Sequence, residues 1–255
     1  MKRDPALQPY DPATYWNERA RRFAGDPTRA VCLDDADENR CIDRIQRHLL
    51  QAALQRIESR TPLPGKTVLD YGCGSGRWVT FLRDRGLVYS GVDIAAQMLA
   101  LARRGHLDAD FRAIEDHDLP YPDKHFDLVW SVAVIHHNPY DAQEQVVREM
   151  ARVLRDDGTL ILFEGLGAHA PSGNYYPRLL QEWVDLAGRN GLTCTWQRGG
   201  TYALLRPLVN RVAPWRRVSA AGLLTRLDAI ATPHLLAFVP PRYHTRAVML
   251  FQRVR

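Results

Sequence analysis

The chain has 255 residues, of which 45% are hydrophobic, 25% charged and 9% aromatic. These fractions are ordinary for a folded protein and exclude a disordered, collagen-like or disulfide-rich class. The formal net charge is 34 − 29 = +5, a mild basic excess that argues only weakly for a nucleic-acid partner. The length fits one large α/β domain or two small ones.

No segment of the sequence resembles a leader or a membrane span. The N-terminus is polar and Pro-rich, without the apolar centre of a signal peptide. Apolar runs such as 132–135 and 160–163 are far shorter than the roughly 20 residues that cross a bilayer. The four cysteines form no CxxC pair and no zinc pattern. We therefore expect a cytoplasmic protein with reduced thiols and no metal.

The first half of the chain shows one helical pattern followed by alternating strands and helices. Apolar residues recur at helical spacing over 42–57, before a TPLPG breaker. Asp141 with Glu144 resembles a capping box that opens a further helix. The DDG tripeptide 156–158 is then expected to be a turn. Strands are predicted at 67–71, 87–93, 109–114, 126–134 and 159–164, and helices near 76–85 and at 94–104.

The second half continues with a helix over 176–190, which Gly191 would terminate. A strand is predicted at 192–198 and a last strand at 244–254, and an insertion with five prolines, 203–241, lies between them. Strands that alternate with helices at this spacing indicate a parallel sheet. Ligands of such sheets bind at the carboxyl ends of the strands, so the residues just after each strand are the candidates for function.

A Gly-rich turn follows the first predicted strand. Asp70 ends the strand, and glycines at 72, 74 and 76 open the next helix. The dinucleotide fingerprint G-x-G-x-x-G would require its third glycine at position 77, where the chain has Arg77. The carboxylate of Asp70 would also repel a pyrophosphate. The turn therefore favours a ligand with a cationic end over a nicotinamide cofactor. A nicotinamide-dependent oxidoreductase remains the alternative from a different class of enzyme.

The next predicted strand ends in Gly91-Val92-Asp93. An acid at this place can accept hydrogen bonds from both hydroxyls of a ribose. Either feature alone is common, but a Gly-rich turn and a strand-end acid on consecutive strands favour a nucleoside site over turn glycines and surface acids.

Four motifs then carry a resemblance to a known family. VLDYGCGSGRW, GVDIAAQML, DLPYPDKHFDLVWSVAVIHHN and EMARVLRDDGTLILFE occur in this order within residues 66–165. The segment resembles the class I S-adenosylmethionine-dependent methyltransferases. The resemblance implies an α/β, Rossmann-like, doubly wound seven-stranded sheet with an antiparallel last strand, an N-terminal helical segment and a helical insertion before the last strand. It also implies S-adenosyl-L-methionine as the cofactor and S-adenosyl-L-homocysteine as the product.

The same resemblance implies roles for individual residues. Asp70 and the 72–76 loop would hold the methionine part of the cofactor, Asp93 would bind the ribose, and Ile94 and Met98 would flank the adenine. Glu115 or Asp116 would supply the acid for the adenine amino group. The cofactor-binding residues expected in this way are Asp70, Tyr71, Gly72, Cys73, Gly74, Gly76, Asp93, Ile94, Met98, Ile114, Glu115, Asp116, Ser131 and Tyr15.

Three aromatic residues, Tyr10, Tyr15 and Trp16, lie in an amphipathic stretch near the N-terminus. An N-terminal helix often folds over the cofactor in this family, where its aromatic rings exclude water. The alternative is that these rings pack on the edge of the sheet.

Methyl transfer from a sulfonium is an in-line displacement, in which the protein holds the reacting atoms in line and a base removes a proton. His136 and His137 follow the fourth predicted strand, and histidine is the natural base near neutral pH. Glu164 ends the fifth strand and is the second candidate. The alternatives are that one histidine binds loop backbone and that the carboxylate of Glu164 binds a nearby donor. No NPPY-like tetrapeptide is present, which disfavours a nucleobase acceptor.

The charge is divided unevenly along the chain. Residues 191–255 contain ten arginines and one acid, so this part carries +9 and residues 1–190 carry −4. The arginines could bind an anionic acceptor. Residues 204–227 could instead rest on an anionic membrane beside a lipid-linked substrate, or the patch could contact RNA phosphates. A solvated, Arg-rich face is the remaining interpretation.

The sequence as a whole predicts one methyltransferase domain over residues 1–255. Residues 1–60 would form an N-terminal helical cap, 61–165 the cofactor-binding core, and 166–255 a substrate-side half. The predicted reaction is methyl transfer to an oxygen or nitrogen of a small molecule, with sugar-containing or anionic natural products as the first acceptors to consider. An RNA methyltransferase and a non-catalytic cofactor-binding protein are the alternatives.

Overall fold

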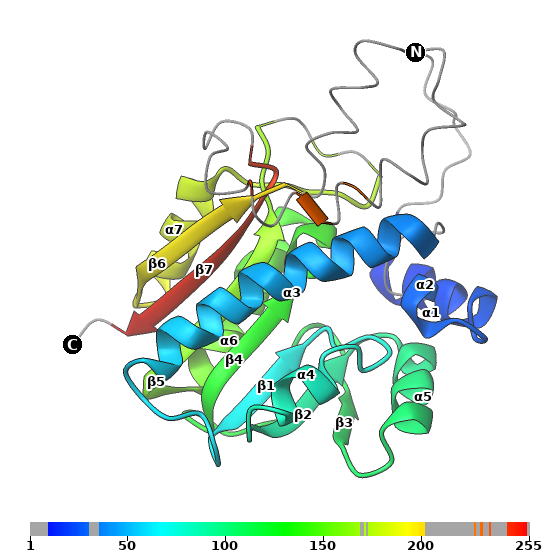
Figure 1. The fold of residues 1–255 in the computed structure, drawn as a ribbon, viewed down its shortest axis with the longest axis horizontal. Coiled ribbons are helices and arrows are strands. Elements are labelled where there is room, and N and C mark those ends of the chain that lie inside the picture. The colour runs from blue at the N-terminus through cyan, green and yellow to red at the C-terminus, as the bar shows by residue number, and fades with distance from the viewer. Residues whose placement is uncertain are drawn as a thin grey trace.

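The computed structural model describes residues 10–30, 36–168, 171, 173–201, 227, 230–231, 235 and 244–253. Figure 1 shows a central twisted sheet with helices on both sides. The helices are α1 (Pro12–Arg22), α2 (Pro27–Ala30), α3 (Ala36–Glu58), α4 (Val79–Arg83), α5 (Ala96–Gly105), the short 3₁₀ helix η1 (Ile135–His137), α6 (Tyr140–Val153) and α7 (Leu180–Arg189). The strands are β1 (Thr67–Tyr71), β2 (Val88–Asp93), β3 (Asp110–Ala113), β4 (Phe126–Val132), β5 (Leu154–Gly165), β6 (Leu192–Gly200) and β7 (Arg246–Arg253).

The seven strands form one mixed sheet in the order β3-β2-β1-β4-β5-β7-β6. The first five strands pair in parallel, and β7 runs antiparallel to both β5 and β6. The predicted seven-stranded sheet with an antiparallel last strand is therefore confirmed. The strand order reverses between β1 and β4, which places the ligand-binding crevice of such a sheet above these two strands.

The two faces of the sheet bury two separate apolar clusters, because successive side chains of a strand point to opposite faces. In β4, Leu128 and Trp130 belong to the cluster beneath α3, α4 and α5, whereas Val129 belongs to the cluster beneath α6 and α7. Both clusters also contain side chains of β1, β5 and β7. The three-layer sandwich follows from strands that are apolar on both faces.

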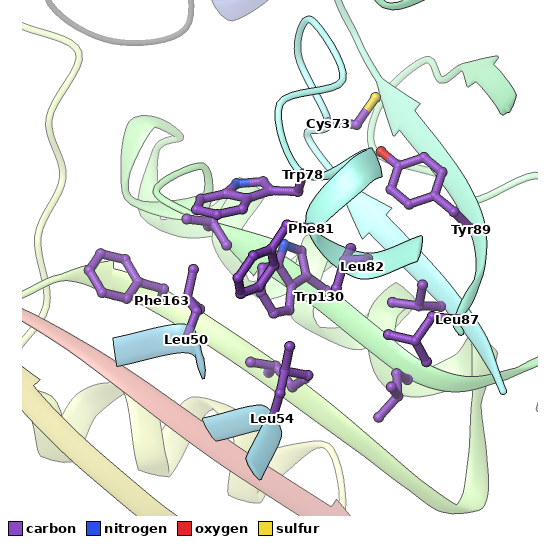
Figure 2. Packing of buried hydrophobic residues seen from close by; sticks show 14 of the residues in the cluster. Leu50, Leu54, Cys73, Trp78, Phe81, Leu82, Leu87, Tyr89, Trp130 and Phe163 are labelled. Carbon is purple, nitrogen blue, oxygen red and sulfur yellow. The ribbon is translucent and has the colours of Figure 1, made fainter. Parts of the chain in front are cut away.

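Aromatic rings fill the centre of the first cluster. Figure 2 shows Leu50 and Leu54 of α3 facing Trp130 of the sheet, with Trp78 and Phe81 beside it. The Trp78 ring lies edge-on to Phe81 at 5.4 Å and to Trp130 at 5.7 Å, a favoured aromatic geometry. This packing fixes α4, and with it the Gly-rich loop that precedes the helix.

Two local predictions were wrong. Helix α6 begins at Tyr140 after Pro139, without a side-chain cap, so Asp141 lies within its first turn. In the first turn, the carboxylate of Asp141 still interacts favourably with the positive end of the helix dipole. Glu144 instead binds Arg189 at 2.9 Å. The DDG tripeptide 156–158 lies within β5, where the pairing with β4 shifts register near Phe126. Glycine permits this bulge because it has no Cβ; a Cβ at Gly158 would lie only 2.9 Å from the Asp127 carbonyl oxygen.

The second half of the chain matches its prediction where the structure describes it. Helix α7 begins four residues later than expected, at Leu180, and ends before Gly191, whose φ of 75° is the left-handed value of a helix C-terminus. Strand β6 extends the predicted 192–198 strand to Gly200. The expected insertion, 203–241, falls almost wholly outside the described residues.

Within the described ranges, no helix is long and apolar enough to cross a bilayer. No group of three His, Cys, Asp or Glu side chains in these ranges could hold a metal ion. Cys73 is a buried free thiol and Cys194 is half-buried.

Candidate active site

An open cavity of about 780 Å³ lies above the carboxyl ends of β1, β2 and β4. The residues come from α1, from the loops after β1, β2, β3 and β4, and from the start of α5. The lining residues are Pro12, Trp16, Tyr71, Gly72, Cys73, Gly74, Arg77, Trp78, Asp93, Ile94, Met98, Ile114, His117, Val132, Ala133, Val134, His137 and Asn138.

The turn after β1 approaches the cavity through its glycines, as predicted. Gly72 has a φ of 71°, a left-handed value that costs other residues about 1–2 kcal/mol. A Cβ at this position would also overlap the side chain of Val134, from the loop after β4. Gly72, Cys73 and Gly74 all line the cavity. The backbone of the loop can therefore lie directly against a ligand.

Asp93, at the end of β2, faces the cavity with a fixed carboxylate. One of its oxygens accepts the Gly74 amide at 2.8 Å, and the other accepts the Ala95 amide at 2.8 Å. Burial raises the pKa of Asp93 to about 6, against the lowering effect of these amides. The side chain is thus a carboxylate at neutral pH, which can accept hydrogen bonds from ligand hydroxyls.

The far end of the cavity beyond Asp93 is apolar. Ile94, Met98 and Ile114 line it, as the sequence predicts. Met98 is almost fully buried and Ile114 largely so. The gap between such side chains suits a flat heterocycle, since the polarizable thioether of methionine packs well against aromatic rings.

The predicted acids at this end do not line the cavity. Glu115 and Asp116 are both exposed, and the carbonyl of Asp116 accepts the side-chain amide of Gln145 at 2.5 Å. His117 lines the cavity instead, with its Nδ1 2.8 Å from the hydroxyl of Tyr71. The sequence analysis missed His117, because the left-handed φ of Asp116 and His117 that turns the ring inward leaves no signal in the sequence.

Three other predicted cofactor residues lie just behind the cavity wall. Asp70 is 1% exposed and accepts the hydroxyl of Tyr89 at 2.8 Å; burial raises its pKa to about 8. Ser131 is fully buried and donates to Glu164 at 3.3 Å. A Cβ at Gly76 would lie 2.8 Å from the ring of His106, so the glycine allows the loop to pack closely there.

Helix α1 covers the cavity with Trp16, the neighbour of the predicted Tyr15. Pro12 and Trp16 line the cavity, whereas Tyr15 stacks edge-on against Tyr10 and Trp16 outside the lining. Residues 12 and 16 are four apart and share one helix face, which the helical period could have identified. The Trp16 ring lies edge-on to His137 at 5.5 Å.

His136 and Glu164 form a buried pair outside the cavity lining. His136 is 2% exposed and Glu164 is 0% exposed. Nδ1 of His136 lies 2.5 Å from Glu164 Oε2 and accepts the Gly165 amide at 3.1 Å. Since Nδ1 accepts from an amide, the shared proton belongs on the acid. Burial raises the pKa of Glu164 to about 7 and lowers that of His136 well below its ordinary value, which fits a neutral pair.

Glu164 also holds the loop after β4. Its Oε1 accepts the amides of Val134 and Ile135 at 3.4 and 3.2 Å, and its Oε2 accepts that of His136 at 3.2 Å. These amides would otherwise be the unsatisfied donors at the start of η1. Ala133, with a φ of 59°, turns the chain into this arrangement. The strand-end acid thus serves as a tertiary cap for η1.

His137 is the histidine that lines the cavity. Its Nδ1 donates to the carbonyl of Asn174 at 2.7 Å, so the other ring nitrogen, Nε2, carries the lone pair of the neutral ring. Burial, followed by the nearby His136, lowers the pKa of His137 to about 3. The ring is neutral at physiological pH, with one tautomer fixed by the loop that contains Asn174.

Arg77 and Asn138 are two further polar residues of the lining that the cofactor prediction did not include. The guanidinium of Arg77 binds Asp43 of α3 at 2.9 Å, which holds it at the wall. Asn138 donates to the carbonyls of Val134 and Ile135 at 3.2 and 3.3 Å. Arg77 thus places a cation at the Gly-rich loop, and Asn138 places a rigid amide beside His137.

Together these features fit S-adenosylmethionine. The fixed carboxylate of Asp93 suits ribose hydroxyls, the apolar gap beside Met98 suits adenine, and the Gly-rich loop leaves room for the methionine part. The strand order and cavity define a nucleoside-binding α/β domain, whose ligand lies at the reversal point between β1 and β4.

Comparison with known proteins gives the family. The profile of the family "Methyltransferase domain" matches residues 69–162, which include the carboxyl ends of β1 and β2. Residues 69–162 thus form a methyltransferase domain of the class I S-adenosylmethionine-dependent type. The expected family, fold class and cofactor are thereby confirmed.

Similar proteins include enzymes and solved structures of this family. The chain is 33% identical over 126 residues to 27-O-demethylrifamycin SV methyltransferase of Amycolatopsis mediterranei, covering 46% of each chain. It is 33% identical over 141 residues to malonyl-[acyl-carrier protein] O-methyltransferase of Enterobacter lignolyticus, covering 55% of this chain and 52% of that one. It thus spans about half the length of these curated relatives.

One solved structure shows the same fold over nearly the whole chain. Magnesium protoporphyrin IX methyltransferase (ChlM) from Synechocystis PCC 6803 with bound S-adenosylmethionine aligns with a TM-score of 0.63 and 16% identity. The alignment covers 97% of this chain and 100% of that one.

Proposed function

We propose that this protein transfers the methyl group of S-adenosylmethionine to a hydroxyl oxygen of a small molecule, with His137 as the general base. The single observation that carries the proposal is the fixed tautomer of His137 beside the cavity, with Nδ1 donating to Asn174. The named activities of the two relatives above, both O-methylations, support oxygen as the acceptor atom.

The chemistry divides between the bound group and the chain. S-adenosylmethionine, when bound, supplies a methyl carbon activated by its sulfonium leaving group. The acceptor oxygen forms a bond to this carbon as the carbon–sulfur bond breaks, and the bond pair stays on sulfur. Nε2 of His137 takes the hydroxyl proton. A weak base is sufficient, because the proton becomes strongly acidic as the new carbon–oxygen bond forms.

The remaining residues of this end hold the acceptor and exclude water. Trp16 covers the cavity above His137, and Val134 and Ala133 give it an apolar floor. A dry site strengthens the contact between base and hydroxyl, and a rigid wall keeps the reacting atoms in line. In this proposal His136 and Glu164, both predicted as catalytic, position the loop and touch no reacting atom.

The acceptor proposed is a small organic molecule of natural-product type, and the ten arginines of residues 191–255 favour an anionic one. Peripheral contact with an anionic membrane beside a lipid-linked acceptor is the alternative use of those arginines. Co-sedimentation with anionic vesicles separates the two: binding at low salt supports the membrane alternative, and no binding supports a free anionic acceptor.

The test uses radiolabelled S-adenosylmethionine and a panel of catechols, hydroxy acids and sugars. On the hydroxyl compound with the highest turnover, His137→Gln should lower kcat by about 10²- to 10⁴-fold, with the affinity for S-adenosylhomocysteine changed less than about threefold. His125→Gln, at an exposed histidine on another loop, is the matched control and should keep wild-type turnover.

Carboxylates give a second arm of the test. A carboxylate has no proton to lose at neutral pH, so methylation of a carboxylate acceptor should not depend on His137. Full turnover of His137→Gln on a hydroxyl acceptor would contradict the base assignment. Transfer to amines but to no hydroxyl compound of the panel would contradict the proposed acceptor atom.

A further inference from the structure

The cofactor cavity contains one polar side chain near its apolar end that no motif of the family predicted. His117 lies with Ile94, Met98 and Ile114, beyond Asp93. These three neighbours are apolar, so they can enclose a heterocycle without selecting its functional groups. Any recognition of polar atoms on the heterocycle therefore depends on His117 or on backbone groups.

The acids expected to do this are directed elsewhere. Glu115 and Asp116 are exposed and absent from the lining. Asp116 and His117 have φ values of 46° and 68°, a left-handed conformation that costs about 1–2 kcal/mol per residue outside glycine. Such conformations persist where surrounding contacts enforce them, and they gather at ligand sites. Here the turn brings His117, rather than the acid before it, into the cavity.

The Tyr71 hydroxyl fixes the His117 ring. Nδ1 of the ring lies 2.8 Å from this hydroxyl, and Tyr71 is 3% exposed at the end of β1. Burial raises the pKa of Tyr71 and lowers that of His117, so both groups are neutral near pH 7. Among the described residues, Nε2 of His117 has no hydrogen-bond partner, which leaves one ring nitrogen for a ligand.

We propose that His117 recognises the exocyclic amino group of the cofactor's adenine, with Nε2 as the acceptor. A neutral histidine carries one N–H and one lone pair. The 2.8 Å contact fits both tautomers of the neutral ring, and the proposal requires the one in which Nδ1–H is donated to the Tyr71 oxygen, so that Nε2 presents the lone pair to the amino group. Tyr71 is thus a positioning residue, and His117 takes the place that an acid was expected to occupy. The proposal rests on the cofactor of the family and is independent of the acceptor.

Calorimetry with two compounds tests the assignment. The first is S-adenosylhomocysteine, and the second is its 6-deamino analogue, which has hydrogen at the purine C6 and keeps N1. Wild-type protein should bind S-adenosylhomocysteine roughly 3- to 10-fold more tightly than the analogue, the effect of one neutral hydrogen bond. His117→Phe should bind both compounds about equally, because the ring that fills the gap has no acceptor.

Three further variants control the experiment. Tyr71→Phe should reduce the preference while leaving His117 in place, and it keeps the test valid if His117→Phe does not fold. Glu115→Gln and Asp116→Asn, at the two acids on the same loop, should keep the wild-type preference. An unchanged preference in His117→Phe, or its loss in Glu115→Gln, would overturn the proposal. Failure of the wild-type protein to bind either compound would contradict the cofactor itself.

Discussion

The two ends of the cavity use strand-end residues in different ways. At the nucleoside end, Asp93 leaves β2 with its carboxylate facing the cavity. At the other end, Glu164 leaves β5 at the same edge of the sheet, but its carboxyl turns inward and binds the amides of the loop after β4. The position of an acid at a strand end therefore does not define its role. Both carboxyls accept backbone amides; they differ because Asp93 also lines the cavity, where a ligand can reach it, whereas Glu164 is fully buried outside the lining.

Removing the inward-facing acid should have the largest effect and should act on stability. Glu164→Ala leaves three amides without their acceptor and the ring of His136 without its donor, at a fully buried position. We expect the free energy of unfolding to fall by about 3–5 kcal/mol. Glu164→Gln keeps the oxygen that accepts the Val134 and Ile135 amides and the donor to His136, but its NH2 cannot accept the His136 amide, so it should cost less than the alanine variant, about 1–3 kcal/mol. Urea denaturation measures both.

The pair of variants also tests the neutral state of the His136–Glu164 contact. If Glu164 were an anion or a catalytic base, Glu164→Gln would abolish turnover while preserving the fold. We expect it to keep most of the turnover, since the amide can donate to Nδ1 of His136 as the protonated acid does. Equal destabilisation by the two variants would contradict the arrangement.

Removing the outward-facing acid should act on binding, in addition to the stability lost with the acceptor of the Gly74 and Ala95 amides. Asp93→Ala removes the charged acceptor expected for the ribose hydroxyls, and hydrogen bonds to charged groups contribute about 1.5–3 kcal/mol. We expect the affinity for S-adenosylhomocysteine to fall by about 100-fold in calorimetry. Asp110→Asn, at an exposed acid on the neighbouring strand β3, should leave the affinity unchanged. A change of less than threefold in Asp93→Ala would remove the distinction between the two ends.

Asp70, the buried acid behind the Gly-rich loop, should have a smaller effect, which appears as a dependence of protein stability on pH. Burial raises the pKa of Asp70 to about 8, so the folded protein binds a proton that the unfolded chain has already lost. Stability contributed in this way is lost as pH rises. Between pH 6.5 and 8 the change is about 2 kcal/mol, and the melting temperature of the cofactor-free protein should fall by about 6 °C.

The range from pH 6.5 to 8 separates the titration of Asp70 from that of the histidines. Burial lowers the pKa of His117, His136 and His137, so their effect on stability lies below pH 6.5, where the unfolded chain takes up protons. Asp70→Asn should remove the larger part of the decrease above pH 6.5, and the remainder belongs to Glu164, whose pKa of about 7 also lies in this range. A melting temperature that stays constant from pH 6.5 to 8 in the wild-type protein would contradict a protonated Asp70.

The sequence predicted the fold and the nucleoside end well because both depend on backbone periodicity and spacing. The alternation of apolar runs implied the sheet, and the Gly-rich turn and Asp93 occur on consecutive strands at a fixed interval. A glycine such as Gly72 also leaves a direct signal, since a left-handed backbone in close contact with Val134 tolerates few other residues.

The predictions that missed depended on the direction of single side chains. His136 and His137 are adjacent in η1, and only the fold of the loop around Glu164 decides that the second faces the cavity. His117 enters the cavity through two left-handed residues, neither of them glycine. Trp16, one of the three aromatic residues named from the sequence, could have been preferred over Tyr15, because it shares a helix face with Pro12.

A crystal structure of the protein with S-adenosylhomocysteine bound tests the central claim, the assignment of the two cavity ends, most directly. The account predicts the adenine between Ile94 and Met98 with its amino group on Nε2 of His117, the ribose hydroxyls on Asp93, and the sulfur directed toward His137. An adenine bound by Glu115, or a sulfur directed away from His137, would contradict it.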